Sequence, residues 1–229
     1  MHEASKQSVS REDLRRYLQF LKRAGFLYLV PSEKKQQDQS SRQARAQQLE
    51  VLHQRAIPCT LCRLAKERKH VVFGEGNPDA DLMFVGEAPG SEEDQQGRPF
   101  VGRSGRLLDE MMLEVGIRRE DVYICNILKC RAPENRDPEP EEIASCEPYL
   151  RAQIDLIKPL VIIALGRYAA HCLSGDKTGI SKMRGTFQLY HDVKLMPTFH
   201  PAAILRDMNQ RTLVVDDLRR ALDEARRLA

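Results

Sequence analysis

Polar and conformationally special residues follow three apolar runs of this sequence, at the points where the runs end. The run 82–85 leads into residues 86–102, which are rich in glycine, proline and carboxylates and carry one aromatic ring, Phe100. Asn126 ends a second run, and His200 follows a third. If the runs are parallel strands, their carboxyl ends share one edge of a sheet, where α/β proteins bind their ligands. The sequence therefore predicts an active site assembled from three strand ends.

The elements that position these residues alternate along the chain. The expected strands are 82–85, 122–126, 160–165 and 193–196, and the expected helices are about 104–115, 141–157, 167–173 and 212–228. Strands that alternate with helices are typical of a parallel sheet covered by helices on both faces. The predicted fold class is therefore α/β.

The first part of the chain differs from the rest in its pattern. Ser10 and Asp13 form a capping box ahead of an amphipathic helix. Residues 31–48 are polar and rich in Gln and Ser without an apolar period, as in a linker or an exposed helix. We therefore expect an N-terminal extension, residues 1–49, followed by one domain, residues 50–229.

Charge and apolar content limit the partners and the compartment. The formal net charge is +3, but residues 1–70 carry 15 Lys and Arg against 7 Asp and Glu. Such a basic front end suits a polyanion, and an ordinary solvated helix surface explains it equally well. No stretch approaches the roughly 20 apolar residues of a membrane span. Because the N-terminus also lacks the apolar core of a secretory signal, we expect a cytoplasmic protein with no membrane partner.

Four cysteines have the pattern of a metal centre. Cys59 and Cys62 are separated by two residues, the gap that lets neighbouring thiolates bind one centre. Cys130 and Cys146 flank a polar, proline-rich segment that cannot easily fill a core, so a metal cross-link would compensate. Four thiolates fit zinc or an iron–sulfur cluster, and their spacing favours neither. The alternative for the first pair is two ordinary thiols near a helix start.

Five ordered features together resemble one known family. They are Gly-Glu-Ala-Pro-Gly at 86–90, Gly-Arg-Pro-Phe-Val-Gly at 97–102, Asn-Ile-Leu-Lys-Cys at 126–130, His-Pro-Ala-Ala-Ile-Leu at 200–205 and the four cysteines. In this order they resemble family 4 uracil-DNA glycosylase over roughly residues 50–229. The resemblance implies a three-layer sandwich with a central four-stranded parallel sheet, a structural [4Fe–4S] cluster on the four cysteines, and hydrolytic removal of uracil from DNA.

The resemblance assigns base recognition to residues of the first two strand ends. Uracil must leave the base stack to be recognised, and Phe100 is placed to stack on the flipped ring. The Asn126 amide can donate to O4 and accept from N3–H, a pattern that cytosine would mismatch. Backbone N–H groups around Gly86 and Ala88 would add contacts. The alternatives are a buried core aromatic for Phe100 and a turn cap for Asn126.

The catalytic roles fall to His200 and Glu87. Cleavage leaves negative charge on the departing uracil, which a neutral imidazole at His200 can stabilise by donating a hydrogen bond. Glu87 would orient a water or balance the cationic sugar. A structural histidine is the alternative for His200, and three further acids rank below Glu87 because such a run is usually a solvated loop. These acids are Glu92, Glu93 and Asp94.

DNA contacts are expected along the rim of the site. Arg103 and Ser104 begin a helix whose free N–H groups suit a phosphate, although a serine cap needs no ligand. Apolar residues just past the histidine could wedge into the gap left by the base. The expected DNA-binding residues are Arg103, Ser104, Lys182, Arg184, Ile204 and Leu205.

The preferred function is a monofunctional uracil-DNA glycosylase that leaves an abasic site. The alternative is a non-catalytic or covalent uracil-DNA-binding relative, which carries a reactive histidine in a basic loop after the asparagine; no histidine lies between Asn126 and Cys146. A third hypothesis is a metal-stabilised nucleic-acid-binding module with idle catalytic residues. The expected partner is uracil-containing DNA, bound by a monomer, with the N-terminal extension as the candidate site for a protein partner.

Overall fold

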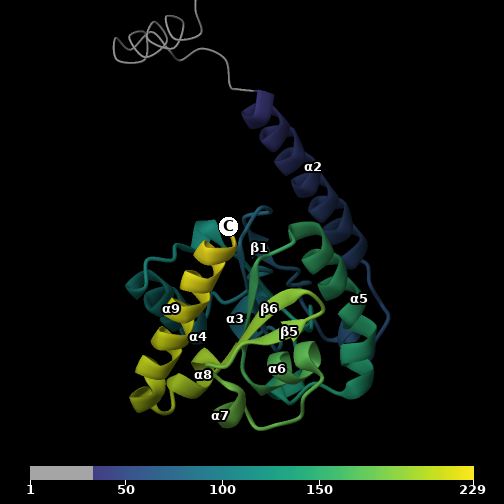
Figure 1. Cartoon of the computed structure of the whole chain (residues 1–229). Helices are drawn as coiled ribbons and strands as arrows, with labels where there is room; N and C mark the ends of the chain where they lie inside the picture. The colour runs from purple at the N-terminus through teal and green to yellow at the C-terminus, as the bar shows by residue number, and fades with distance from the viewer. Residues whose placement is uncertain (1–32) are drawn as a thin grey trace, which may run out of the picture. The chain divides into compact units, whose positions relative to one another are not determined.

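The computed structural model describes residues 33–229, with side chains from residue 41 onward. The strands of this part are β1 Glu75–Gly76, β2 Leu82–Gly86, β3 Tyr123–Asn126, β4 Val161–Leu165, β5 Gln188–Tyr190 and β6 Val193–Thr198. Its α-helices are α2 Glu33–Ala56, α3 Ser91–Gln96, α4 Arg103–Glu114, α5 Pro140–Ile157, α6 Arg167–Ser174, α7 Ile180–Met183, α8 Pro201–Ile204 and α9 Arg211–Leu228 (Figure 1). The helix predicted after Ser10 lies outside the described residues.

The sheet confirms the predicted α/β class but has six strands in its described part instead of four. Its order is β1-β3-β2-β4-β6-β5, and the four central strands β3, β2, β4 and β6 run parallel. Strands β1 and β5 pair antiparallel with the two ends of this parallel set. Both edge strands are only two or three residues long and are not fully buried, so they carry no apolar run that the sequence pattern could reveal.

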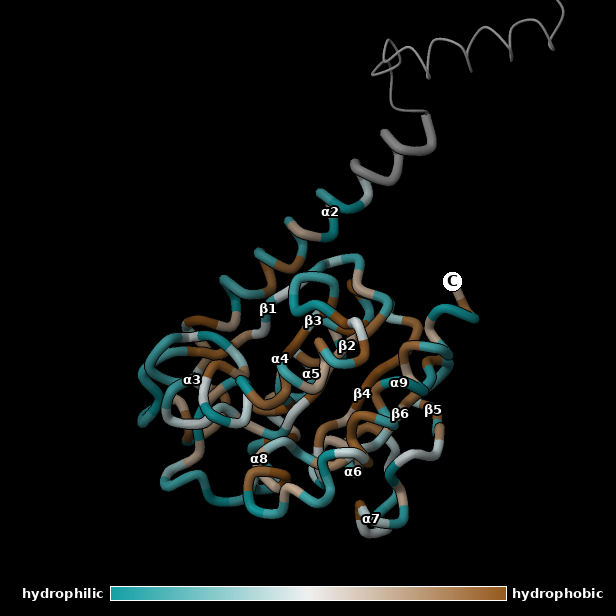
Figure 2. Tube along the Cα trace, turned by 90° about the vertical axis from the view of Figure 1, so that its left-hand side faces the viewer, coloured by the Kyte–Doolittle hydropathy of each residue, from teal (hydrophilic) through white to brown (hydrophobic). Residues whose placement is uncertain are grey.

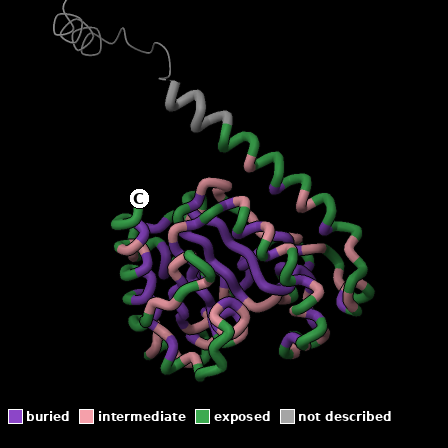
Figure 3. The backbone as a smooth tube through the Cα atoms, turned by 45° about the vertical axis from the view of Figure 1, so that its right-hand side comes forward, coloured by how far each residue is buried: buried purple, intermediate pink, exposed green. Residues whose placement is uncertain are grey.

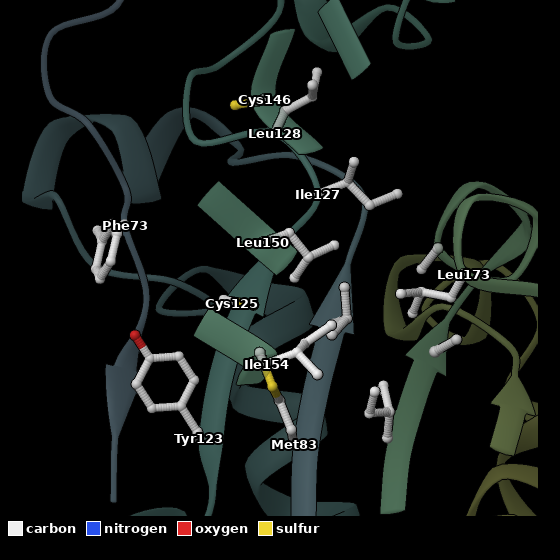
Figure 4. Packing of buried hydrophobic residues seen from close by; sticks show 14 of the residues in the cluster. Phe73, Met83, Tyr123, Cys125, Ile127, Leu128, Cys146, Leu150, Ile154 and Leu173 are labelled. Atoms are coloured by element: carbon white, nitrogen blue, oxygen red, sulfur yellow. The ribbon is translucent and has the colours of Figure 1, made fainter. Parts of the chain in front are cut away.

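Alternating side chains of the central strands divide the core between the two faces of the sheet. In β2, Met83 and Val85 join a cluster that contains residues of α5 and α6, whereas Leu82 and Phe84 join a second cluster with residues of α4 and α9. Figure 1 shows α4 and α9 on one side of the sheet and α5 on the other. Figure 4 shows part of the first cluster, and Figure 3 shows the buried strands between the helices. The strand ends are therefore held from both faces.

Two segments that looked polar in the sequence are helical. Residues 33–48 of the stretch expected to be a linker or exposed helix lie in α2, which is largely hydrophilic (Figure 2) and continues past residue 49. The boundary between residues 1–49 and 50–229 stays a prediction. The three consecutive acids expected in a solvated loop form the first turn of α3, where carboxylates interact favourably with the helix dipole. No described helix is both long and apolar enough to cross a membrane.

Candidate active site

A cleft with a volume of about 510 Å³ lies where the parallel strands end. Three strand ends contribute to it, because Glu87 follows β2, Asn126 ends β3 and His200 follows β6. The predicted site residues that line it are Glu87, Ala88, Phe100, Ser104, Asn126 and His200. The structure thus brings together the groups that the sequence analysis placed at one sheet edge.

Asn126 forms part of the cleft wall with an unsatisfied acceptor. Its side chain is 1% exposed, and its Oδ1 has no hydrogen-bond partner. Gly86 lies beside it in the parallel register, and a Cβ at Gly86 would be 2.3 Å from that Oδ1 and 2.5 Å from Cζ of Phe100. Only glycine therefore lets the amide and the aromatic ring approach each other at this point.

Phe100 has a strained backbone that its surroundings hold in place. Its φ is +51°, a conformation that costs of order 1–3 kcal/mol for a residue other than glycine. Arg119 donates hydrogen bonds to the carbonyls of Pro99 at 2.6 Å and Phe100 at 3.3 Å. A Cβ at Gly105 in α4 would lie 1.9 Å from the Phe100 carbonyl oxygen. The loop is therefore clamped between a guanidinium and the bare backbone of a helix.

Glu93 anchors the other end of the same loop. Its Oε1 accepts hydrogen bonds from the backbone N–H groups of Val101 at 2.9 Å and Gly102 at 2.7 Å. Asp94 is also buried and accepts a hydrogen bond from the backbone N–H of Lys69 at 2.9 Å. Of the acids expected in a solvated loop, these two are buried structural acceptors, because α3 turns them toward the body of the protein.

His200 is held as a neutral hydrogen-bond donor. It caps α8, and its Nδ1 accepts from the backbone N–H of Ala202 at 3.1 Å, so the proton of the neutral ring resides on Nε2. Burial lowers the pKa of His200 to about 4, helped by the nearby Arg206 and opposed by Glu93. Its ring centroid lies 5.6 Å from that of Phe100.

Gly166, at φ +89°, allows the side chain of His200 to approach the end of β4. A Cβ at this position would lie 2.9 Å from Cβ of His200. Gly166 also donates its N–H to the carbonyl of Thr198, the last residue of β6. A side chain here would displace the histidine from the cleft.

Glu87 brings to the cleft a carboxyl group with a raised pKa. Burial raises the pKa of Glu87 to about 7, the carboxylate of Asp137 adds to the rise, and Arg167 opposes it. A carboxyl group with this pKa exchanges its proton near neutral pH, as general bases do.

Comparison with known proteins decides the family. A family model described as the uracil DNA glycosylase superfamily matches residues 73–223. A type-4 uracil-DNA glycosylase of Thermotoga maritima is 49% identical over 181 residues, which cover 77% of this chain and 94% of that protein. A type-4 uracil-DNA glycosylase of Sulfurisphaera tokodaii is 43% identical over 75% of this chain and 82% of that protein. The chain belongs to the type-4 uracil-DNA glycosylase family.

Around the cleft, the residues predicted to bind DNA fall into two groups. Arg103 and Lys182 are exposed, Ser104 lines the cleft, and Leu205 is 36% exposed. Two other predicted residues make internal contacts; the surface role of the first, which is fully buried, needs correction, whereas that of the second, which is partly exposed, stays a prediction. They are Ile204 and Arg184.

Ile204 and Arg184 make packing and ion-pair contacts that stabilise the fold. Ile204 is 0% exposed and packs in the core cluster with α4 and α9, because it points inward from α8. Arg184 pairs with the buried Asp217 of α9, with Nε 2.9 Å from Oδ2, and donates to the carbonyl of Leu213. The guanidinium group is thus held in an ion pair that joins the end of α7 to α9.

The four cysteines line a second cavity. Cys130 and Cys146 are buried, and Cys59 and Cys62 are partly exposed. Burial raises the pKa of the Cys130 thiol to about 11 and also raises that of Cys146. Within residues 33–229, no group of three or more His, Cys, Asp or Glu side chains is gathered around the position of one metal ion.

Three residues shape the site in ways that the sequence analysis did not predict. Glu93 was ranked below Glu87 because an acidic run gives no sign of burial. Arg119 gave no signal, since its partners lie 10 to 44 positions away in the chain. Gly166 directly follows a predicted strand, and a glycine at a strand end that meets a ligand edge could have been recognised.

Proposed function

We propose that this protein removes uracil from DNA by hydrolysing the N-glycosidic bond and leaves an abasic site. The observation that carries the proposal is the unsatisfied Oδ1 of Asn126 in the cleft wall beside Phe100. Leaving a buried acceptor unpaired costs about 1–3 kcal/mol, and N3–H of a flipped uracil would supply the missing donor. The type-4 relatives carry the same activity in their names, which supports the proposal.

Base selection would follow from the two groups on either side of Gly86. Phe100 would stack on the flipped ring, while the Asn126 amide accepts from N3–H and donates to O4. Cytosine presents an acceptor at N3 and an amino group at C4, so both hydrogen bonds would be mismatched. The backbone around Gly86 and Ala88 would complete the contacts to the base.

Bond cleavage would depend on His200 and Glu87. The Nε2–H of the neutral His200 would donate to O2 of the departing uracil, where negative charge develops. Glu87, when ionised, would orient the attacking water or balance the positive charge on the sugar. Glu93 already accepts two backbone N–H groups, so Glu87 is the better candidate for this role.

The DNA backbone would be bound at the exposed rim. Arg103 and Ser104 would hold a phosphate at the start of α4, and Lys182 would add a second positive contact. Leu205 would enter the space vacated by the flipped nucleotide, because it is the exposed member of the apolar pair. Arg184 and Ile204 would support this rim from beneath.

We further propose a [4Fe–4S] cluster held by Cys59, Cys62, Cys130 and Cys146. All four cysteines line one cavity, and four thiolates fit either zinc or an iron–sulfur cluster. The type-4 family to which the chain belongs favours the cluster. The cluster would supply a cross-link between the loop after α2, the segment after β3 and α5.

Incubation with a uracil-containing oligonucleotide, followed by alkali, tests the proposed activity. We expect strand cleavage at the uracil with the wild-type protein and little or none with the His200→Ala variant. A binding module would retain the oligonucleotide without producing alkali-labile sites. A covalent relative would instead give a protein–DNA complex that survives denaturation. Either result would refute the proposal.

A further inference from the structure

Lys129 is a buried cation whose hydrogen-bond partners are neutral. Its side chain is 2% exposed, and Nζ donates to the backbone carbonyl of Asn126 at 2.7 Å and to Oε1 of Gln153 at 2.6 Å. Nζ also lies 5.9 Å from the ring centroid of Phe73. These contacts solvate the ammonium group but do not cancel its charge, and an uncompensated buried charge is expensive.

The surrounding polar groups hold this ammonium in one position. Nε2 of Gln153 donates to the carbonyl of Phe73 at 2.9 Å and to the hydroxyl of Tyr123 at 3.0 Å, which turns Oε1 toward Lys129. Phe73 and Tyr123 lie next to α5 in the core, as Figure 4 shows. The network therefore fixes a positive charge at a defined place beside the sheet.

Negative charge would arise next to Lys129 when the four cysteines bind a metal group. Lys129 lines the same cavity as the cysteines, and its backbone N–H lies 3.3 Å from Sγ of Cys146. Metal ligation requires thiolates, and four thiolates leave an iron–sulfur cluster with net negative charge. Arg68 also reaches this cavity, with Nη1 3.3 Å from Sγ of Cys130, but its side chain is partly exposed to solvent, which screens its charge.

We propose that Lys129 is the counter-charge of the thiolate-bound cluster and a positioning residue for uracil recognition. The inference rests on the cluster and activity proposed above. One end of Lys129 lies at the cysteine cavity, and its Nζ holds the carbonyl of Asn126, the residue whose amide faces the base. Occupancy of the cysteine site and alignment of the base-reading amide are therefore coupled through a single side chain.

Three variants separate the charge from the hydrogen bond. Lys129→Gln keeps a donor and removes the charge, Lys129→Arg keeps the charge, and Lys177→Gln removes an exposed lysine as the matched control. Iron per chain and the half-time of iron loss in chelator report the cluster. Binding of a duplex with 2′-fluoro-deoxyuridine, which resists cleavage, against the same duplex with thymidine reports base recognition. Circular dichroism reports the fold.

We expect Lys129→Gln to bind iron about 10- to 100-fold more weakly than the wild type, the usual effect of removing a group that supports metal ligands, and therefore to lose iron faster in chelator. Its preference for the uracil duplex should fall with iron content. Lys129→Arg should hold iron nearly as long as the wild type, and Lys177→Gln should match it in both measurements.

Two results would overturn the inference alone. One is a folded Lys129→Gln protein that keeps iron and uracil preference at the wild-type level. The other, decisive if Lys129→Gln does not fold, is a folded Lys129→Arg protein that loses iron quickly. A wild-type protein that binds no iron would refute the proposed cluster and this inference together, whereas failure to cleave uracil by an iron-loaded wild type would refute only the proposed activity.

Discussion

At the scale of single residues, burial favours the neutral form of both catalytic candidates, Glu87 and His200. It raises the pKa of Glu87 to about 7 and lowers that of His200 to about 4, because desolvation disfavours the charged form of each group. Both side chains are therefore biased toward neutrality. A neutral His200 suits a hydrogen-bond donor to a departing anion. The raised pKa of Glu87 means that its carboxyl group ionises near neutral pH.

Glu87 should set the pH dependence of the reaction. Because its carboxylate forms only above a pKa of about 7, kcat should rise as pH increases through this value. The Glu87→Gln variant should lose this rise of kcat with pH, and its kcat should be about 10²–10⁴-fold lower, the usual contribution of a general base. Single-turnover rates between pH 5 and 9 measure both effects, and a wild-type rate that is flat across this range would exclude the role.

The same carboxyl group should reduce stability at high pH. The folded pKa of Glu87 exceeds the ordinary value of 4.5, so between these two pH values the folded state binds more protons than the unfolded state. The contribution of Glu87 to folding is therefore lost as pH rises through about 7. We expect Glu87→Gln to melt at a higher temperature than the wild type at pH 8 and at a similar temperature at pH 4, as measured by calorimetry.

Asn126 should lower the stability of the protein while it supports uracil cleavage. Replacing it with leucine removes the unsatisfied Oδ1 and should stabilise the protein by about 1–3 kcal/mol, while uracil cleavage is lost. Denaturant unfolding and the oligonucleotide assay measure the two effects, and Asn209→Leu at an exposed position serves as the control. Loss of stability in Asn126→Leu would mean that the amide supports the fold and is not reserved for a ligand.

At the scale of elements, α4 positions the loop that carries Phe100. Replacing Gly105 with alanine would ordinarily stabilise a helix by about 1 kcal/mol. Here the new Cβ would meet the Phe100 carbonyl at 1.9 Å, so the loop must move. We expect Gly105→Ala to lose about 100-fold in kcat/KM, as displacement of a substrate-positioning group by about 1 Å can.

Gly179→Ala provides the matched control for the Gly105→Ala prediction. Gly179 precedes α7 with φ −63°, and a Cβ there would meet no atom within 4 Å. Its activity should equal that of the wild type. Equal activity of Gly105→Ala would show that the Phe100 loop tolerates displacement and that its clamped geometry is not needed for the reaction.

Comparison of the observed elements with the expected ones shows which features the sequence patterns predict. The four central strands and helices α4, α5, α6 and α9 were predicted within a few residues, because apolar runs and helical periods arise from burial on the sheet. Glu87, Asn126 and His200 were placed together because parallel strand ends meet. Inward rotation of Ile204 and the internal partner of Arg184 depend on tertiary packing, which local spacing does not encode.

At the scale of the whole molecule, the cysteine cavity joins parts of the chain that are distant in sequence. Cys59 and Cys62 follow α2, Cys130 follows β3, and Cys146 lies in α5. The packed layers on the two faces of the sheet contain most of the core and need no metal for their contacts. The proposed cluster should therefore stabilise one margin of the fold, while the sheet is an independent source of stability.

Removal of the cluster should consequently loosen the protein locally. A cross-link of this span is worth about 2–4 kcal/mol by comparison with disulfides, which corresponds to a fall in Tm of about 5–15 °C for a chain of this size. Hydrogen exchange after treatment with chelator should accelerate in residues 57–70 and 130–146 and stay slow in β2 and β4. Equal acceleration across the sheet would contradict this division, because it would mean that the core depends on the cluster for its fold.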